Sequence, residues 1–153
     1  MKYIELNEQR GEVSVNFDRY FEYLKSARSQ ISAQLYDYAS KLEHYSLDGN
    51  SSLHDAWLSA AQFAYREKEL TLEFLGARHD RKLIFKYTGV KTYTIDLSVQ
   101  FTHGDGDVLV QEFRVDDGFV THEIVFSGNR TIVIASKSVN PSIQFLQASD
   151  APS

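Results

Sequence analysis

Hydrophobic positions in the first part of the chain recur at alternating spacings of four and three residues. The stripe consists of Phe17, Phe21, Leu24, Arg28, Ile31, Leu35, Tyr38, Leu42 and Tyr45, and no proline or glycine interrupts it. Spacings of three and four residues place side chains on one face of an α-helix. The pattern therefore predicts one long amphipathic helix over 17–45, with Asn16 placed to cap its N-terminus.

From residue 68 onward the pattern changes to strict alternation of apolar and polar residues, which is typical of β-strands with one buried face. The alternating segments are 70–74, 83–87, 93–101, 108–115, 119–126, 131–139 and a short piece at 143–146. Glycine, asparagine and aspartate separate several of them, and these residues tolerate the positive φ of tight hairpins. Short connections between consecutive strands predict an antiparallel meander of about six or seven strands.

Two segments are harder to assign. Short alternating pieces at 3–6 and 12–15 predict a small hairpin or two edge strands. Segment 53–66 fits a helix face through its alanines, but Trp57, Phe63 and Tyr65 also fit one face of a strand. We assign segment 53–66 as a strand.

The predicted fold class is therefore α+β, with one long N-terminal helix packed on the meander. At 153 residues the size predicts a single domain, which we place at 1–147, followed by a disordered tail at 148–153.

Composition narrows the possible functions. The sequence has no cysteine, which excludes disulfides and thiol chemistry and favours a cytoplasmic location. The formal net charge of −5 argues against nucleic-acid binding, which needs a basic surface. No apolar run is long enough to cross a membrane, and the polar start lacks the apolar core of a signal peptide. No dinucleotide-binding or nucleophile-elbow motif is present, so we expect no cofactor.

Histidines beside acids supply the candidate catalytic and metal-binding groups. A histidine next to a carboxylate can serve as a general base or as an oriented metal ligand. The catalytic candidates are His54, Asp55, His79, Asp80, Arg81, His122 and Glu123, and the weaker metal-ligand candidates are His54, His79, His103 and His122. Neighbours on a strand point to opposite faces, so any site must combine a histidine from one segment with an acid from another.

Simpler structural interpretations compete with these roles. His122 shares an apolar face with Val120 and Ile124, which favours a buried core histidine. The sequence His79-Asp80-Arg81 is typical of a polar hairpin turn. Residues 103–107 contain glycine and aspartate but lack the spacing and terminal glutamate of a calcium-binding loop, which favours a turn there too.

Aromatic residues provide candidate interaction positions. A helix of 29 residues is about 43 Å long, which exceeds the width of a six-stranded sheet, so its end would overhang. We name Tyr38, Leu42 and Tyr45 at that end, together with Trp57, as interaction residues because Tyr and Trp dominate interface energetics. The chain would then be a monomer or a helix-mediated homodimer.

Three motifs together carry a resemblance: Ser-Leu-His-Asp-Ala-Trp at 52–57, Leu-Gly-Ala-Arg-His-Asp-Arg at 75–81 and His-Glu-Ile-Val-Phe at 122–126. In this order they resemble a group of small uncharacterised bacterial proteins with a helical first part and a strand-rich second part. The resemblance covers about residues 45–135 and implies that 53–66 is a strand. It implies no activity. The size and acidity are also similar to those of immunity proteins from bacterial toxin systems.

The leading hypothesis is a cytoplasmic protein-binding module, of the type of an immunity-like antagonist of a toxin. It rests on the negative charge, the abundant tyrosine and the lack of a complete catalytic signature, which also favours a non-enzymatic function. The alternatives are a metal-dependent enzyme or metal-binding protein that uses the His/Asp/Glu pairs, and a small-ligand-binding domain with a pocket between helix and sheet.

Overall fold

The computed structural model describes residues 1–9, 12–46, 49, 51–96 and 106–147. The N-terminal elements in these ranges are β1 (Glu5–Gln9), β2 (Glu12–Asn16), α1 (Asp18–Ala27), the 3-10 turn η1 (Arg28–Gln30), α2 (Ala33–Ala39) and the 3-10 turn η2 (Leu42–His44). The remaining strands are β3 (Trp57–Ala64), β4 (Glu69–Leu75), β5 (Arg81–Thr88), β6 (Thr92–Ile95), β7 (Val108–Asp116), β8 (Phe119–Phe126), β9 (Arg130–Ser136) and β10 (Ser138–Phe145).

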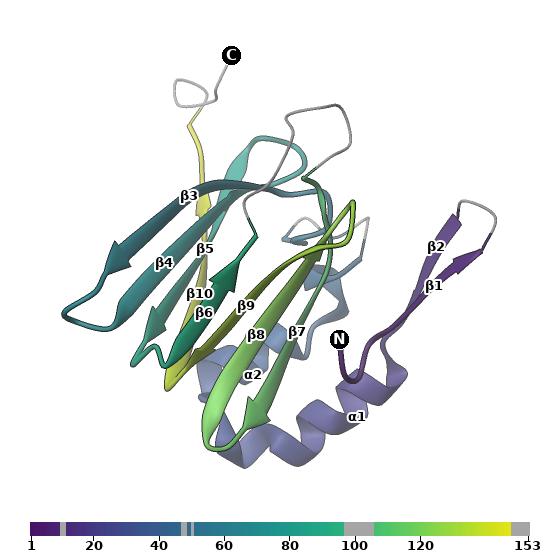
Figure 1. Cartoon of the computed structure of the whole chain (residues 1–153). Coiled ribbons are helices and arrows are strands. Elements are labelled where there is room, and N and C mark those ends of the chain that lie inside the picture. Colours follow the sequence, from purple (N-terminus) through teal and green to yellow (C-terminus); the bar gives the residue numbers. More distant parts are fainter. Residues whose placement is uncertain (10–11, 47–48, 50, 97–105, 148–153) are drawn as a thin grey trace.

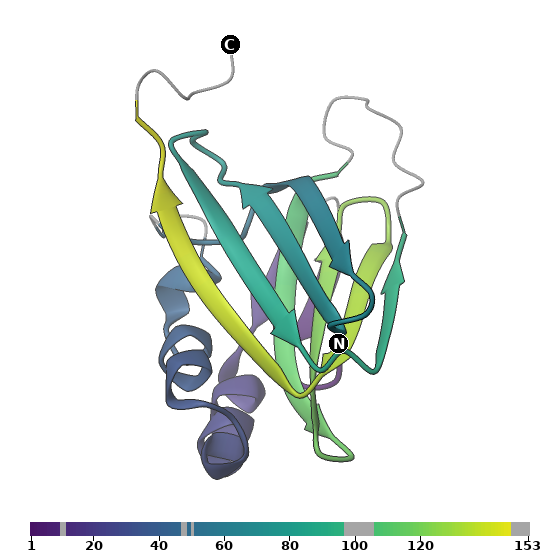
Figure 2. The ribbon, with the colours of Figure 1, turned by 90° about the vertical axis from the view of Figure 1, so that its left-hand side faces the viewer.

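Eight of these strands form two antiparallel four-stranded sheets (Figure 1). The strand orders are β10-β5-β4-β3 and β6-β9-β8-β7, and β1 and β2 pair separately as a hairpin. The two sheets face each other through aromatic side chains: Phe74 packs against Phe126, and Phe85 against Phe113. The core therefore lies between two sheets, and Figure 2 shows the helical segment at one side of this sandwich, next to β10.

The single long helix predicted over 17–45 is wrong. The chain is helical over α1 and α2 but turns between them, where Ser32 is extended at φ −64° and ψ 151°. The Ser32 hydroxyl accepts the Leu35 N–H at 3.1 Å and so caps a new helix. The Ser26 hydroxyl donates to the Tyr23 carbonyl near the end of α1. Serines that bond the backbone locally compete with helix continuation, which explains the break.

The predicted fold class, α+β with one long helix on a single meander, is wrong: the described residues are mostly β, with ten strands in three sheets and two short α-helices. The β4–β5, β7–β8 and β8–β9 hairpins are antiparallel as expected. However, β9 passes through Lys137 into β10, which pairs with β5 of the other sheet, and β6 pairs with β9. A face buried against a helix and a face buried against a second sheet have the same period of two, so alternation alone could not separate these arrangements.

Two further predictions are confirmed. Segment 53–66 contains strand β3, and the N-terminal alternating pieces form the β1–β2 hairpin. Asn16 is not the N-cap that was predicted, because α1 has Phe17 in that position, but the Asn16 side chain accepts the Asp18 N–H at 2.9 Å. The predicted tail at 148–153 lies outside the described residues, as does much of the predicted strand 93–101.

Helix α1 closes the outer edge of β7 with tyrosine hydroxyls. Tyr20 accepts the N–H of Phe113 at 2.9 Å, and Tyr23 accepts the N–H of Val115 at 2.7 Å. The Tyr45 hydroxyl donates a hydrogen bond to the Ala39 carbonyl at 2.7 Å, so the Tyr20 hydroxyl, 3.1 Å away, is the donor in its hydrogen bond to Tyr45. Burial raises the pKa of Tyr20 far above its ordinary value, which keeps this hydroxyl protonated. The helix thus completes the hydrogen bonding of a strand edge.

The first residues of the chain add a second cover to β7. The carboxylate of Glu112 is fully buried and accepts the backbone N–H groups of Tyr3 and Ile4, each at 2.8 Å. Next to it, Glu123 bonds the Met1 amino group at 2.6 Å and Arg114 at 2.5 Å. A buried carboxylate is tolerated only with such partners, so these bonds tie the N-terminal segment to the sheet.

The edge of β10 is protected in a different way. It contains Pro141, which has no N–H to offer to another strand. The carbonyl of Pro141 accepts the side-chain amide of Gln34 from α2 at 3.2 Å. The helical segment therefore lies against one edge of each sheet, β7 through α1 and β10 through α2.

The hydrogen bonds between β7 and the tyrosines of α1 predict a loss of stability when one of the hydroxyls is removed. Tyr20→Phe removes the acceptor for the buried Phe113 N–H and the donor to Tyr45, so the free energy of unfolding should fall by about 1–3 kcal/mol. Urea denaturation measures this change. The matched control is Tyr36→Phe on α2, whose ring lies against Arg28, and it should leave stability within about 0.5 kcal/mol. Equal losses in the two variants would contradict the claim that the Tyr20 hydroxyl stabilises the edge of β7.

Candidate functional site

The two sheets have four outer edges, which are unequally covered. Helices α1 and α2 bond to β7 and β10, and Figure 2 shows them on the side of the sandwich away from β3 and β6. Within the described ranges, no strand pairs with the outer side of β3 or of β6. Of these two, β6 has 4 residues and β3 has 8. Strand β3 is therefore the longer edge open to another chain.

The composition of β3 leaves this edge unprotected. Residues 57–65 contain neither a charged residue nor a proline, although natural proteins commonly use both to block edge strands. The strand has one irregularity, between Leu58 and Ala60, where the Ser59 hydroxyl donates to the Glu73 carbonyl at 3.0 Å. Beyond it, β3 pairs regularly with β4 as far as Ala64. A long uncharged edge of this kind is a template for β-pairing.

An exposed tryptophan stands at the beginning of the edge. Trp57 is 48% exposed, and its indole N–H donates to the Asp107 carboxylate, which fixes the ring. The ring of His79, in the turn between β4 and β5, lies 4.8 Å away between centroids. A large aromatic side chain that is exposed but held in place is typical of an interaction anchor.

A second aromatic group stands at the other end of β3. Phe63 is 51% exposed, and its ring lies 5.1 Å from that of Tyr93 on β6, so the two rings meet across the gap between the sheets. Tyr65, directly after β3, is 91% exposed. We use the name β3 edge for residues 57–65, with Trp57 at one end and Tyr65 at the other.

The His54–Asp55 and Asp80–Arg81 pairs are local contacts. His54 Nδ1 lies 3.0 Å from Asp55 Oδ1 but without hydrogen-bond geometry to it. Asp80 and Arg81 form a bidentate pair at 2.5 and 2.6 Å, and the Arg81 guanidinium holds the pKa of Asp80 below its ordinary value. His79 and Asp80 lie in the turn between β4 and β5, as the simpler interpretation predicted, but Arg81 is the first residue of β5; His54 and Asp55 lie in the turn before β3.

His122 and Glu123 are engaged in separate structural contacts. His122 is fully buried, with Nδ1 2.6 Å from the Tyr87 hydroxyl and Nε2 3.0 Å from the Gln111 amide oxygen. Burial holds its pKa well below its ordinary value, so the ring is neutral. Burial alone would raise the pKa of Glu123, but the bonds from the Met1 amino group and from Arg114 lower it. Both groups stabilise the packing of β8.

The metal candidates do not form a site in the described part of the chain. No group of three or more His, Asp or Glu side chains there is arranged to hold an ion. Of the four histidines named, His122 is in the core, His54 and His79 are in turns, and His103 lies outside the described residues. The metal hypothesis therefore has no geometric support among the residues described.

The predicted interaction residues divide into two classes. Tyr38 and Tyr45 are buried: the Tyr38 ring stacks on His44, and Tyr45 bonds Tyr20. Leu42 and Trp57 are exposed, at 53% and 48%. Sequence reasoning did not name Phe63, Tyr65 or Tyr93 as interaction residues, because an uncharged run such as 57–65 is found in buried strands as well as at edges.

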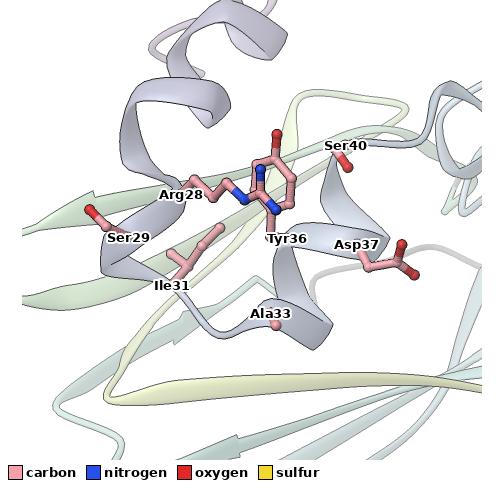
Figure 3. Close-up of a pocket in the computed structure, with 7 residues that line it drawn as sticks. All are labelled: Arg28, Ser29, Ile31, Ala33, Tyr36, Asp37 and Ser40. Atoms are coloured by element: carbon pink, nitrogen blue, oxygen red, sulfur yellow. The ribbon is translucent and has the colours of Figure 1, made fainter.

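A shallow cleft lies between the end of α1 and α2, as Figure 3 shows. Its volume is about 540 Å³, and it is lined by Arg28, Ser29, Ile31, Ala33, Tyr36, Asp37 and Ser40. The Arg28 guanidinium stacks on the Tyr36 ring at 4.9 Å, and Asp37 pairs with Lys41 at 2.8 Å. The small-ligand hypothesis expected an aromatic pocket between helix and sheet, whereas this cleft lies between the two helices and its charged groups already have partners.

No helix in the described residues combines the length and the apolar character that a membrane span requires.

Comparison with known proteins gives little further information. No protein-family model matches the chain, and no curated protein matches it. Among solved structures, the chain is similar to an uncharacterised protein from Neisseria gonorrhoeae at 16% sequence identity with a TM-score of 0.47. The similarity covers 61% of this chain and 93% of that chain.

The neutral buried His122 predicts a pH dependence of stability. An unfolded histidine binds a proton below about pH 6.5, but native His122 does not, so acidification favours unfolding. Between pH 6.5 and 5 the free energy of unfolding should fall by up to about 1.4 kcal/mol per pH unit from this group, and buried His44 shifts in the same direction. Urea titrations at several pH values should show a shallower slope for His122→Gln. Parallel slopes for the wild type and the variant would contradict a neutral His122.

Proposed function

We propose that the protein is a protein-binding module whose partner contributes an extended segment that pairs with the β3 edge. The observation that carries the proposal is the contrast between edges. Tyrosine hydroxyls accept N–H groups of β7, and β10 contains Pro141, whose carbonyl accepts the side-chain amide of Gln34. In contrast, the eight residues of β3 are uncharged, and no strand in the described structure pairs with their outer side.

Strand addition supplies both affinity and selectivity at such an edge. Hydrogen bonds along the backbone hold the added segment, and side chains at alternate positions give preference for particular sequences. Trp57 and Tyr65 are the aromatic anchors at the two ends, and Phe63 with Tyr93 provides apolar surface between the sheets. Anchors of this type carry most of the binding energy of many interfaces.

The charge of the molecule supports a particular class of partner. A formal net charge of −5 favours association with a basic protein, because complementary potentials accelerate encounter. We infer a cytoplasmic role as an antagonist of a toxin-like protein, on the basis of this charge, the small size and the absence of cysteine. In this role the β3 edge would hold a strand of the toxin.

A charged residue on the edge tests the proposal. Gln62→Lys places an exposed charge in the middle of β3, while Thr94→Lys places the same charge on exposed β6 and serves as the matched control. Affinity capture from lysate of the source, followed by reconstitution with the purified partner, should show binding weakened at least about tenfold by Gln62→Lys and unchanged by Thr94→Lys.

The contact itself is tested by hydrogen exchange on the reconstituted complex. Amides of β3 should exchange more slowly in the complex than in the free protein, because they become bonded to the partner. A partner that binds both variants equally and leaves the exchange of β3 unchanged would overturn the proposal.

A further inference from the structure

We propose that Lys91 and Lys137 form a binding site for the phosphate group of a small phosphorylated molecule. The site goes beyond the proposed function, because both lysines lie outside the β3 edge. The observation that carries the proposal is that the ring of Phe119 holds both ammonium groups, while no acid of the described structure forms an ion pair with either of them.

The two lysines belong to the connections through which the chain passes from one sheet to the other. Residues 89–91 lead from β5 into β6, and Lys137 leads from β9 into β10, so both connections lie at the same end of the sandwich (Figure 1). The Lys137 N–H donates to the Thr88 carbonyl at 3.0 Å. The Lys91 N–H donates to the Ala135 carbonyl at 2.8 Å. The backbone that carries both lysines is therefore fixed, as a binding site requires.

The side chain of Lys137 is held in place by its surroundings. Its Nζ lies 4.0 Å from the centroid of Phe119, and its stem lies against Gly89. A Cβ atom at position 89 would stand 2.8 Å from Cγ of Lys137, so a glycine is needed there to leave room for the stem. Gly89 also has a φ of 62°, which favours glycine at the same position. The connection and the ring together define where this charge lies.

The second ammonium group converges on the same ring. Lys91 Nζ lies 4.6 Å from the Phe119 centroid. An aromatic face attracts a cation through its quadrupole, but it carries no net charge and neutralises neither ammonium group. The two like charges repel each other, and each ammonium group has three N–H donors. An anion that bridges the two groups removes the repulsion and accepts hydrogen bonds from both.

The acids that precede Phe119 do not supply this anion. Asp116 accepts a hydrogen bond from Arg114 Nε at 2.9 Å and is engaged there. Asp117 is exposed in the turn between β7 and β8 and forms no ion pair with either lysine of the site. An external anion is therefore needed to neutralise the two charges.

The surroundings of the site are basic, although the chain as a whole is acidic. The turn between β3 and β4 contains the exposed side chains of Arg66 and Lys68, with Glu67 as its acid. The Val90 N–H donates to the Lys68 carbonyl at 2.9 Å, which joins this turn to the connection that carries Lys91. The local excess of positive charge attracts anions to this end of the sandwich.

The charge of the site selects a phosphate among common anions. A phosphate monoester carries a charge of about −1.5 to −2 at pH 7 and three acceptor oxygens, which matches two ammonium groups better than a single carboxylate does. Lysine binds phosphate as a point charge. The formal net charge of −5 disfavours an extended polyanion such as a nucleic acid, so the ligand is small. Both lysines are exposed, which leaves the rest of such a ligand free to extend into solvent.

Titration of the intact chain with inorganic phosphate at low ionic strength, followed by NMR of the backbone amides, tests the site. We expect saturable binding with a dissociation constant of about 1 mM or below and shifts centred on residues 89–91 and Lys137. Lys91→Gln and Lys137→Gln should each weaken binding at least about fivefold, whereas Lys137→Arg should retain it. The matched control is Lys86→Gln, which removes the same charge from a lysine that Glu69 pairs at 3.2 Å. It should leave the affinity within about twofold.

Two further comparisons separate a defined site from general charge attraction. Phe119→Leu removes the ring that positions both ammonium groups without changing the net charge, and it should also weaken phosphate binding. Succinate, a dicarboxylate, should bind at least about fivefold more weakly than phosphate. The proposal is overturned if phosphate does not bind, or if all three glutamine variants weaken it equally. Equal affinity for succinate would overturn the assignment to phosphate.

Discussion

The outer edge of each sheet carries backbone groups that need partners, and the tyrosine hydroxyls of α1 supply them for β7. Tyr20 and Tyr23 accept hydrogen bonds from the N–H groups of Phe113 and Val115, and the Tyr20 hydroxyl donates a hydrogen bond to Tyr45. These bonds connect the helical segment to the sandwich and set the position of α1. With β7 and β10 covered, the remaining long edge is β3. This strand is therefore the candidate edge for binding a partner.

The buried polar groups of the core are consistent with a structural role. His122, Gln111 and Tyr38 form a hydrogen-bonded chain between the sheets and the helical segment, with Tyr87 bonded to the other side of the imidazole. A buried chain of this kind costs free energy unless every member has a partner, and it specifies one packing when they all do. His122, one of the catalytic candidates, thus stabilises the sandwich, and surface residues remain as the candidates for function.

The sequence predicted the hairpins well because apolar alternation and turn residues act locally. It also placed His122 on a buried face and His79 in a turn, where the structure has them. The long helix could not be excluded by periodicity, because Ser32 caps a new helix after the break through a hydrogen bond that a hydrophobic pattern does not contain. The division into two sheets depends on where β10 pairs after Lys137, which is a non-local choice. The β3 edge became visible only once the other edges were seen to be covered.

Amide hydrogen exchange of the isolated protein at low concentration tests the central claim most directly. The account predicts that the amides of Phe113 and Val115 exchange slowly at the covered β7 edge, while alternate amides of β3 exchange rapidly. It also predicts that the β3 amides become slow when a partner that adds a strand to β3 is bound. Amides along β3 that are all as slow as those of β7 in the dilute protein would contradict the claim that this edge is open.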